Sequence, residues 1–269
     1  FGINADSELV DIPLYDGSKA IAIEQRLTAT DLKTARFVWS AARVLCRFLS
    51  SGVILSPDDG DPGPISALSP NLSHNEGPTL APASLPTNVL RALELGSGTG
   101  VCSAALARSL GSNCEVQATD LPSSLHLIAD TLSRNNLEGF VSVAALDWSD
   151  PSSYSLMSGM HLIFGADITY SDDLNMQLFA VLQHACSAGS VVILAHEHRG
   201  PAEDFEHSMT EGLSCLGVGW AELSPERWSD NNDADGCQPL VSIYLLATPS
   251  ADMLNAGLLS SLKECVKSG

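Results

Sequence analysis

Positive charge is scarce in this chain of 269 residues, which has 13 Lys and Arg against 32 Asp and Glu and a net charge of −19. A nucleic-acid-binding surface needs a basic patch, so the deficit argues against a nucleic-acid partner. It suits a basic protein partner, although acidity also serves solubility alone. Apolar runs long enough to cross a membrane, ~20 residues, are missing as well, so no membrane partner is expected.

Closely spaced cysteine pairs are also absent. The seven cysteines are scattered along the chain and never form a C-x-x-C pair. This pattern argues against a disulfide framework or a zinc site and indicates a reducing compartment. No signal-peptide pattern is visible. We therefore expect a cytoplasmic protein, with the nucleus as the alternative.

What the sequence does contain is a glycine-rich turn. Residues 89–95 form a short apolar run that includes Glu94, glycines follow at every second position of 96–100, and an Ala-rich segment at 101–110 is typical of a helix. Glycine permits φ > 0 and a close approach of ligand to backbone, and a helix start offers free N–H groups. The third glycine comes one residue too early for G-x-G-x-x-G. The E-L-G-x-G-x-G form resembles motif I of the class I S-adenosylmethionine (SAM) methyltransferases, and a Rossmann-like site for another nucleoside is the alternative.

Strands and helices alternate after this turn. Strands are predicted at 115–119, 140–145, 161–166 and 190–196, and helices at 122–135, 171–187 and 201–215. Right-handed crossovers then give an α/β, doubly wound, mostly parallel sheet. The strands at 219–223 and 239–248 are linked only by a polar connection with its turn residues at 229–236, so they should form an antiparallel hairpin. This seven-stranded order resembles the methyltransferase sheet.

The chain reads as one methyltransferase domain, 1–269, and we expect a monomer. Two short runs around Asp16-Gly17 predict a β-hairpin, and Asp31 is placed to begin a helix that runs to Ser50. The predicted parts are an N-terminal hairpin and helix (1–50), a mobile insertion rich in Pro, Gly and Ser (51–88), a SAM-binding core (89–248) and a C-terminal helix (249–269).

Polar residues follow the carboxyl ends of the predicted strands, where open α/β sheets bind ligands. Asp120 ends the second strand of the core, at a spacing suited to a ribose diol, or else it caps the next helix. Asp147 and Trp148 follow the third strand, where the acid can bind the adenine amino group and the indole can cover the ring. A surface acid beside a buried tryptophan is the alternative.

The fourth strand is followed by Asp167-Ile168-Thr169-Tyr170. Enzymes that methylate nucleobase amines commonly carry Pro-Pro between the first and last of these residues. The D-x-x-Y form, together with V-W-x-x-A at residues 38–42, resembles the protein-lysine methyltransferase group of the seven-strand enzymes. The resemblance implies that Asp167 and Tyr170 face the target amine, and that Trp39 and the main chain of Ala166 contact SAM.

The candidate catalytic residues are Asp167 and Tyr170. The candidate SAM-binding residues are Trp39, Glu94, Gly96, Ser97, Gly98, Asp120, Leu121, Asp147, Trp148 and Ala166. The family pattern usually has a glycine shortly before V-W, where this chain has Lys, Thr, Ala and Arg at 33–36.

Two further clusters are weaker candidates. The sequence His-Glu-His at 196–198 looks like a ligand set but lacks a third ligand, so no metal is predicted. Acidic residues at 203–211 and 230–235 are read as a solvated face or as a docking surface for a basic segment around the target lysine.

The sequence thus predicts a SAM-dependent methyltransferase that acts on a lysine side chain of a protein. Methylation of a small-molecule amine, or of another protein side chain such as histidine, is the nearest alternative. A SAM-binding protein without turnover is the alternative from another class.

Overall fold

The structure is a computed structural model that describes residues 7–26, 35–51, 89–169, 172–199, 212, 219–223 and 241–247. At its centre is a seven-stranded sheet of order β5-β4-β3-β6-β7-β9-β8. Its strands are β3 (Leu90–Glu94), β4 (Cys114–Asp120), β5 (Val141–Ala145), β6 (Leu162–Ala166), β7 (Val191–Glu197), β8 (Gly219–Leu223) and β9 (Val241–Ala247). Strands β3 to β7 pair in parallel, and β9 runs antiparallel to both β7 and β8. The predicted doubly wound sheet with an antiparallel C-terminal hairpin is confirmed.

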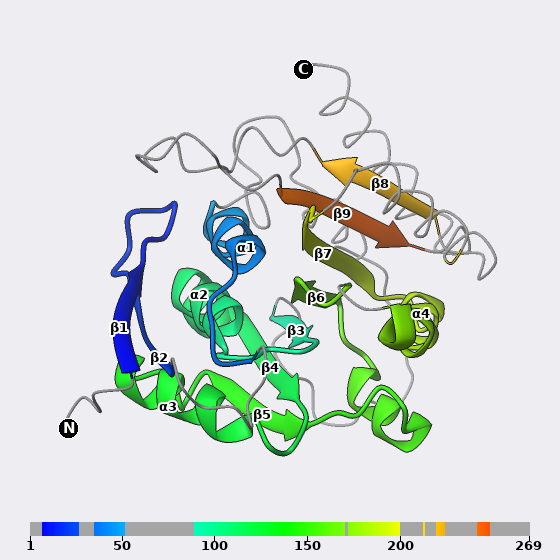
Figure 1. The fold of residues 1–269 in the computed structure, drawn as a ribbon, viewed down its shortest axis with the longest axis horizontal. Coiled ribbons are helices and arrows are strands. Elements are labelled where there is room, and N and C mark those ends of the chain that lie inside the picture. Colours follow the sequence, from blue (N-terminus) through cyan, green and yellow to red (C-terminus); the bar gives the residue numbers. More distant parts are fainter. Residues whose placement is uncertain are drawn as a thin grey trace, which may run out of the picture.

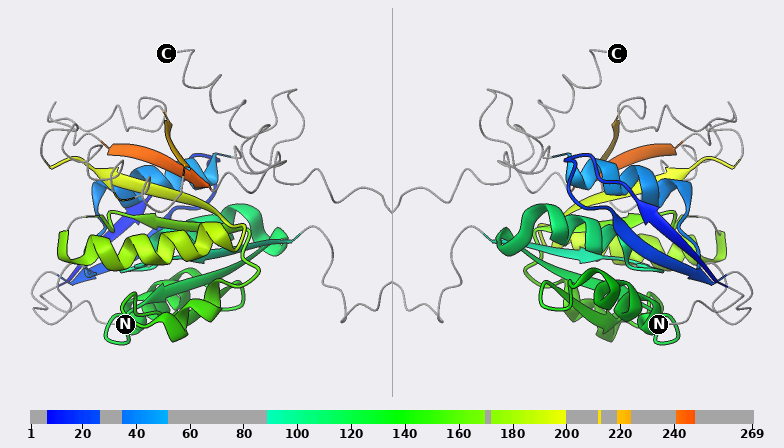
Figure 2. Two further views of the ribbon diagram at one scale, coloured as in Figure 1. Left: turned by 90° about the vertical axis from the view of Figure 1, so that its right-hand side faces the viewer. Right: turned by 90° about the vertical axis from the view of Figure 1, so that its left-hand side faces the viewer.

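Helices cover both faces of the sheet, as Figures 1 and 2 show. The first face carries α1 (Ser40–Ser50), α2 (Val101–Leu110) and α3 (Leu125–Asn135), and the second carries α4 (Asp172–Ser187). One apolar core lies under the first three helices and a second lies under α4. Strands β6 and β7 are nearly all apolar because they are buried on both faces.

The predicted N-terminal hairpin is present but does not extend the sheet. Its strands β1 (Ser7–Ile12) and β2 (Ile21–Arg26) pair antiparallel, with Ile12 opposite Ile21. The hairpin lies against α2 and α3, where the side chain of Asn135 bonds both the N–H (3.0 Å) and the C=O (2.8 Å) of Ala22. These two bonds replace the ladder bonds that a strand at the edge of the sheet would supply.

The start predicted for the first helix is wrong. Asp31 lies outside the described residues, but residues 35–39 are described and are not helical, and α1 begins at Ser40 after an extended Trp39 (φ −74°, ψ 160°). The N–H of Val38 donates to the buried side chain of Gln25 at 2.8 Å. This contact with the hairpin holds the segment away from helical geometry, so tertiary structure overrides the helical spacing of its apolar residues.

Other elements differ at their boundaries. Helix α3 begins at Leu125 with Ser124 at its N-cap. The 3₁₀ helix η3 (Pro151–Met157) was not predicted; Asp150 caps it by accepting from the Ser152 N–H at 3.0 Å. Of the helix predicted at 201–215, only residue 212 is described, as helical. The 51–88 insertion, the connection at 229–236 and the helix at 249–269 lie outside the described residues. Within the described ranges, no helix is long and apolar enough to cross a membrane.

The sheet order determines where a ligand can bind. Strand β3 pairs with β4 on one side and with β6 on the other, so the direction of strand succession reverses at β3. The loops after β3, β4, β5 and β6 leave from the same edge of the sheet, and a crevice opens there. The predicted site residues lie in these loops.

Candidate functional site

The glycine loop between β3 and α2 has a backbone that other residues rarely adopt. Gly96, Gly98 and Gly100 have φ of 58°, 54° and 76°. A Cβ on Gly96 would lie 2.9 Å from Ile168 Cγ2, and one on Gly98 would lie 3.2 Å from the carbonyl oxygen of Ala35. Glycine is therefore required both by the left-handed backbone and by the close packing of other loops on it.

Hydrogen bonds to the end of β4 hold this loop in place. Ser97 N–H donates to the Thr119 carbonyl (2.9 Å), and the Ser97 hydroxyl accepts from the Thr119 N–H (3.0 Å). The Asp120 carboxylate accepts from the N–H groups of Gly98 (2.8 Å) and Leu121 (2.7 Å). Desolvation raises the pKa of Asp120 above its ordinary value, although these hydrogen bonds oppose the shift. Asp120 does not cap α3, whose N-cap is Ser124, so that alternative is wrong.

Glu94 lies at the base of the crevice. It is 2% exposed, and one of its oxygens accepts from the N–H (3.0 Å) and the hydroxyl (2.5 Å) of Ser103 in the first turn of α2. Burial raises the pKa of Glu94 to about 7, against the lowering effect of these hydrogen bonds. The carboxyl thus ties the end of β3 to the start of α2.

Asp147 and Trp148 form the wall after β5. One carboxylate oxygen of Asp147 accepts from the N–H (2.9 Å) and hydroxyl (2.7 Å) of Ser149, which lowers the pKa of this exposed acid. The half-buried indole of Trp148 lies 3.4 Å from the position that a Cβ on Gly96 would take. The aromatic ring therefore packs directly over the glycine loop.

Asp167 follows β6 in a left-handed conformation (φ 56°) and is 7% exposed. Its N–H donates to the Ala195 carbonyl at 2.7 Å, which joins it to β7. Both of its carboxylate oxygens accept from the guanidinium of Arg199, one from Nη1 at 3.1 Å and the other from Nη2. The same guanidinium lies over the Trp39 ring, 5.3 Å from its centroid. Arg199 thus connects the loops after β6 and β7 with the start of α1.

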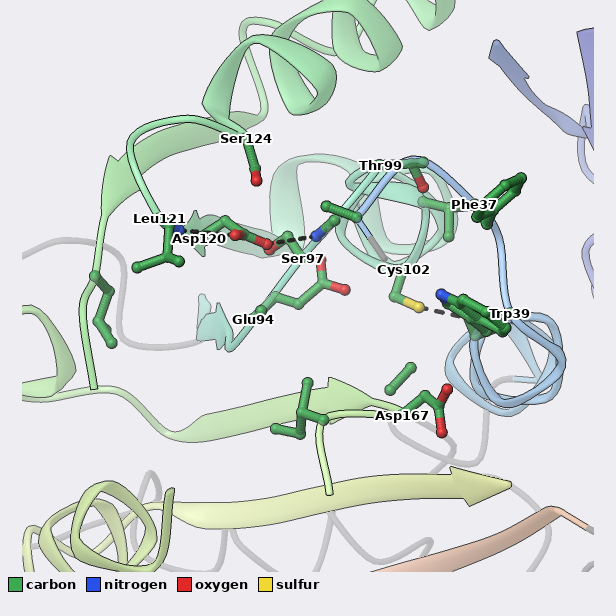
Figure 3. Close-up of a pocket in the computed structure, with 18 of the residues that line it drawn as sticks. Phe37, Trp39, Glu94, Ser97, Thr99, Cys102, Asp120, Leu121, Ser124 and Asp167 are labelled. Carbon is green, nitrogen blue, oxygen red and sulfur yellow. Dashed lines mark hydrogen bonds between the residues drawn. The ribbon is translucent and has the colours of Figure 1, made fainter. Parts of the chain in front are cut away.

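These loops enclose a single cavity of about 600 Å³, within the size range of small-molecule sites. Figure 3 shows Trp39 and Asp167 near each other at one side of the opening, across from Asp120 and Leu121. All ten predicted SAM-binding residues line this cavity, and so does Asp167. Their roles stay predictions. Tyr170 lies outside the described residues.

Sequence reasoning missed some of the lining residues. Arg199 comes three residues after the predicted end of its strand, and that position already placed it at the edge where Asp167 was expected. Phe37 lines the cavity beside Trp39, with the two rings 5.9 Å apart. Nothing in the pattern around Phe37 indicated this role, since the segment was predicted to be helical.

His196, near the end of β7, and His198, just after it, form hydrogen bonds with neighbouring hydroxyl groups. His196 Nδ1 lies 2.8 Å from the Thr169 hydroxyl, and His198 Nε2 lies 2.9 Å from the Ser242 hydroxyl. Burial lowers the pKa of His196 to about 4, so the ring is neutral at physiological pH. Within the part of the chain that the structure describes, no three His, Cys, Asp or Glu side chains are grouped as a metal site. The acidic residues at 203–211 and 230–235 lie outside that part.

The cavity fits a methionine-bearing nucleoside. A glycine cradle that a Cβ would fill, a partly buried acid with hydrogen-bonding capacity at the ribose position, and an indole wall are what SAM needs to bind. The residues that would hold the nucleoside are Gly96, Gly98, Asp120 and Trp148.

Among solved structures, the fold is similar to that of the O-methyltransferase NcsB1 from neocarzinostatin biosynthesis, with a TM-score of 0.45 and 17% identity over 59% of this chain and 48% of that one. The chain is 29% identical over 167 residues to protein N-lysine methyltransferase METTL21A of Danio rerio, covering 61% of each protein. It is 32% identical over 110 residues to EEF1A lysine methyltransferase 3 of Mus musculus, covering 40% of this chain and 46% of that protein.

The aligned regions thus span about half to three fifths of the length of these curated relatives. Residues 17–211, most of the chain, match the model of the family described as lysine methyltransferase. The chain therefore belongs to the lysine methyltransferase family.

Proposed function

We propose that the protein transfers a methyl group from SAM to the side-chain amine of a lysine in a protein substrate. The observation that carries the proposal is the position of Asp167: this buried residue follows β6 and lines the same cavity as the glycine loop. The family match and the relatives named as lysine methyltransferases support it.

When bound, SAM supplies an electrophilic methyl group on sulfur, which becomes a thioether as the new N–C bond forms. The acceptor nitrogen must therefore present a free lone pair. A lysine with a pKa of about 10.4 is neutral only about once in 2,500 molecules at pH 7, a deficit of about 4.6 kcal/mol. The protein has to bind the amine without stabilising its protonated form.

The side chains of the cavity serve this task in different ways. Apolar surface from Trp39 and Ile168 desolvates the amine and lowers its pKa. Asp167 accepts a hydrogen bond from the amine and aims its lone pair, and the proton leaves to water before attack. The main contribution is the alignment of nitrogen, methyl carbon and sulfur. Tyr170 is assigned to the same amine by resemblance.

The wider context of the reaction is part of the proposal. We expect the substrate segment to be basic, because the chain carries a net charge of −19. We expect a monomer in the cytoplasm or nucleus. Within the described part of the chain, Cys46, Cys102, Cys114 and Cys186 form no disulfide, which supports a reducing compartment.

The test is incubation of the purified protein with cell extract and methyl-labelled SAM, followed by mass spectrometry of the labelled band. Methyl-lysine in a protease-sensitive product is the expected result. Label that survives protease treatment would indicate a small-molecule acceptor, and label on histidine would indicate that side chain. SAM binding by calorimetry without any label transfer would leave a SAM-binding protein without turnover.

A further inference from the structure

Asp167 and Arg199 form an ion pair at the side of the cavity where the acceptor amine is proposed to bind. A lone carboxylate beside the target amine stabilises the ammonium form, which cannot attack. Asp167 is not alone, because its two oxygens accept from two nitrogens of one guanidinium. Its side chain is 4% exposed and that of Arg199 is 42% exposed. The buried charge is therefore balanced within the protein, not by solvent.

We propose that Arg199 is a positioning residue that balances the charge of Asp167, so that the acceptor lysine binds beside a neutral pair and gives up its proton. This inference rests on the proposed lysine methylation. The pair still offers carboxylate lone pairs that can accept an N–H bond from a neutral amine. It orients the nucleophile while removing most of the electrostatic preference for its charged form.

Two contacts fix the position of Arg199, and a third group lies nearby. The two-pronged bond to Asp167 sets the plane of the guanidinium. The Trp39 ring, 5.3 Å from the guanidinium carbon, covers it from the side of α1. A carboxylate oxygen of Glu197 lies 3.9 Å away, beyond hydrogen-bonding distance. Arg199 therefore acts mainly on Asp167, and Glu197 leaves one further negative charge nearby.

Other ionisable groups face this region and stay unchanged in the test. On β7 these are Glu197 and His196, which is neutral because burial lowers its pKa to about 4, and His198 follows the strand. Across the cavity they are Glu94 on β3, Asp120 on β4 and Asp147 after β5. On the segment before α1, Arg36 lies over the ring of Phe37, 4.7 Å from its centroid. Because every variant keeps these groups, differences between variants report the pair itself.

The experiment is the pH dependence of kcat for wild type and R199Q between pH 7 and 10.5. The acceptor is the recombinant protein identified by the extract assay, and SAM is saturating. The acid limb of kcat reports ionisation in the substrate complex. Removing the guanidinium leaves Asp167 uncompensated and raises the pKa of the bound amine, so we expect the limb to move up by about one pH unit.

The expected pattern separates charge from structure. At pH 8, R199Q should be about tenfold slower than wild type, and the difference should shrink to about twofold at the high-pH plateau. The KM for the acceptor should stay the same or fall, since an uncompensated carboxylate binds the ammonium form better. Calorimetry should show unchanged SAM affinity. A kcat lowered equally at all pH values would overturn the proposal. A higher kcat/KM in R199Q would overturn it too, because it would mean that Arg199 blocks access of the acceptor to the cavity.

Matched variants guard the result. Arg43 is exposed on α1 and does not line the cavity. R43Q therefore makes the same charge change and should leave the acid limb of the kcat profile where it is in wild type. R199K keeps the positive charge and should retain the wild-type midpoint even if kcat falls. Should R199Q fail to fold in a thermal melt, an upward shift with R199K would overturn the inference. Absence of methyl-lysine with wild type at every pH would instead refute the proposed function.

Discussion

The two sides of the cavity are held together by different forces. The side after β3 and β4 is fixed by hydrogen bonds between neighbouring loops, such as the reciprocal pair that joins Ser97 and Thr119. The side after β6 and β7 is fixed by the ion pair of Asp167 and Arg199, which Trp39 covers. The first side is largely backbone, whereas the second depends on side-chain charge.

Under the proposed function, this difference suits the two sides to different tasks. Backbone groups fixed by strand pairing form a rigid cradle, which suits a cofactor that is the same in every turnover. A charged pair with one exposed partner suits an acceptor that arrives on another protein and has to lose a proton. Changes on the first side should therefore weaken SAM binding, and changes on the second should slow turnover.

Removal of the carboxylate at Asp167 should produce the largest effect. We expect Asp167→Ala to abolish detectable methylation, a loss of at least about 100-fold in kcat, because the amine loses its orienting acceptor. SAM affinity, measured by calorimetry, should be nearly unchanged. Asp167→Asn is the control for strain, since asparagine tolerates the left-handed backbone that alanine does not. Equal losses of SAM binding and turnover would make Asp167 a cofactor residue and break the comparison.

The first side can be tested at Asp120. Asp120→Asn keeps an oxygen for the Gly98 N–H but loses the charge that a ribose diol would use. A hydrogen bond to a charged group contributes about 1.5–3 kcal/mol, so the Kd for SAM should rise by about 10- to 100-fold. With saturating SAM, kcat should approach the wild-type value. Asp147 is exposed, so Asp147→Asn should weaken binding less; the reverse order would mean that adenine contacts dominate.

A pair of glycines separates backbone strain from packing. Gly96 and Gly111 both have positive φ, but a Cβ would meet Ile168 at 2.9 Å on Gly96 and nothing within 4 Å on Gly111. Both alanine variants should lose about 1–2 kcal/mol of unfolding free energy, measured by denaturant titration. Only Gly96→Ala should also lose SAM affinity, by about tenfold, since Ile168 and Trp148 must shift. Equal SAM affinities in the two variants would show that the close packing is irrelevant to binding.

The two sides also differ in how well the sequence predicted them. The first side could be predicted because the glycine motif is contiguous in the sequence. Asp120, the acid that binds the glycine loop, lies at a spacing that the strand-helix-strand unit fixes. The sheet order followed from alternating strands and helices for the same reason. Local patterns were sufficient wherever the contacts join consecutive elements.

The second side, after β6 and β7, was harder to predict because its contacts join distant parts of the chain. The start of α1 was misplaced because the bond from Val38 to Gln25, which keeps the preceding segment extended, is a tertiary contact. The partner of Asp167 was missed although Arg199 follows the adjacent parallel strand, 32 residues later. Adjacent strand ends place the two residues at one edge, but only the structure shows that they meet.

The smallest effect concerns Glu94, which tests whether the first side depends on charge at all. Burial raises its pKa to about 7, above the value of about 4.3 of an unfolded chain. The folded state therefore binds more protons between these two values, and the stability contributed by this group is lost as pH rises through 7. Glu94→Gln removes the titration while keeping an oxygen that can accept from Ser103.

Denaturant titrations of wild type and Glu94→Gln at pH 6 and pH 8.5 measure this contribution. Repulsion among the excess acidic groups also changes with pH, but it is nearly common to both proteins and cancels in their difference. Between the two pH values, wild type should lose about 1 kcal/mol of unfolding free energy relative to the variant. A constant difference would mean that Glu94 stays ionised at pH 6, so that the carboxylate itself binds α2 and the first side, like the second, is held by charge.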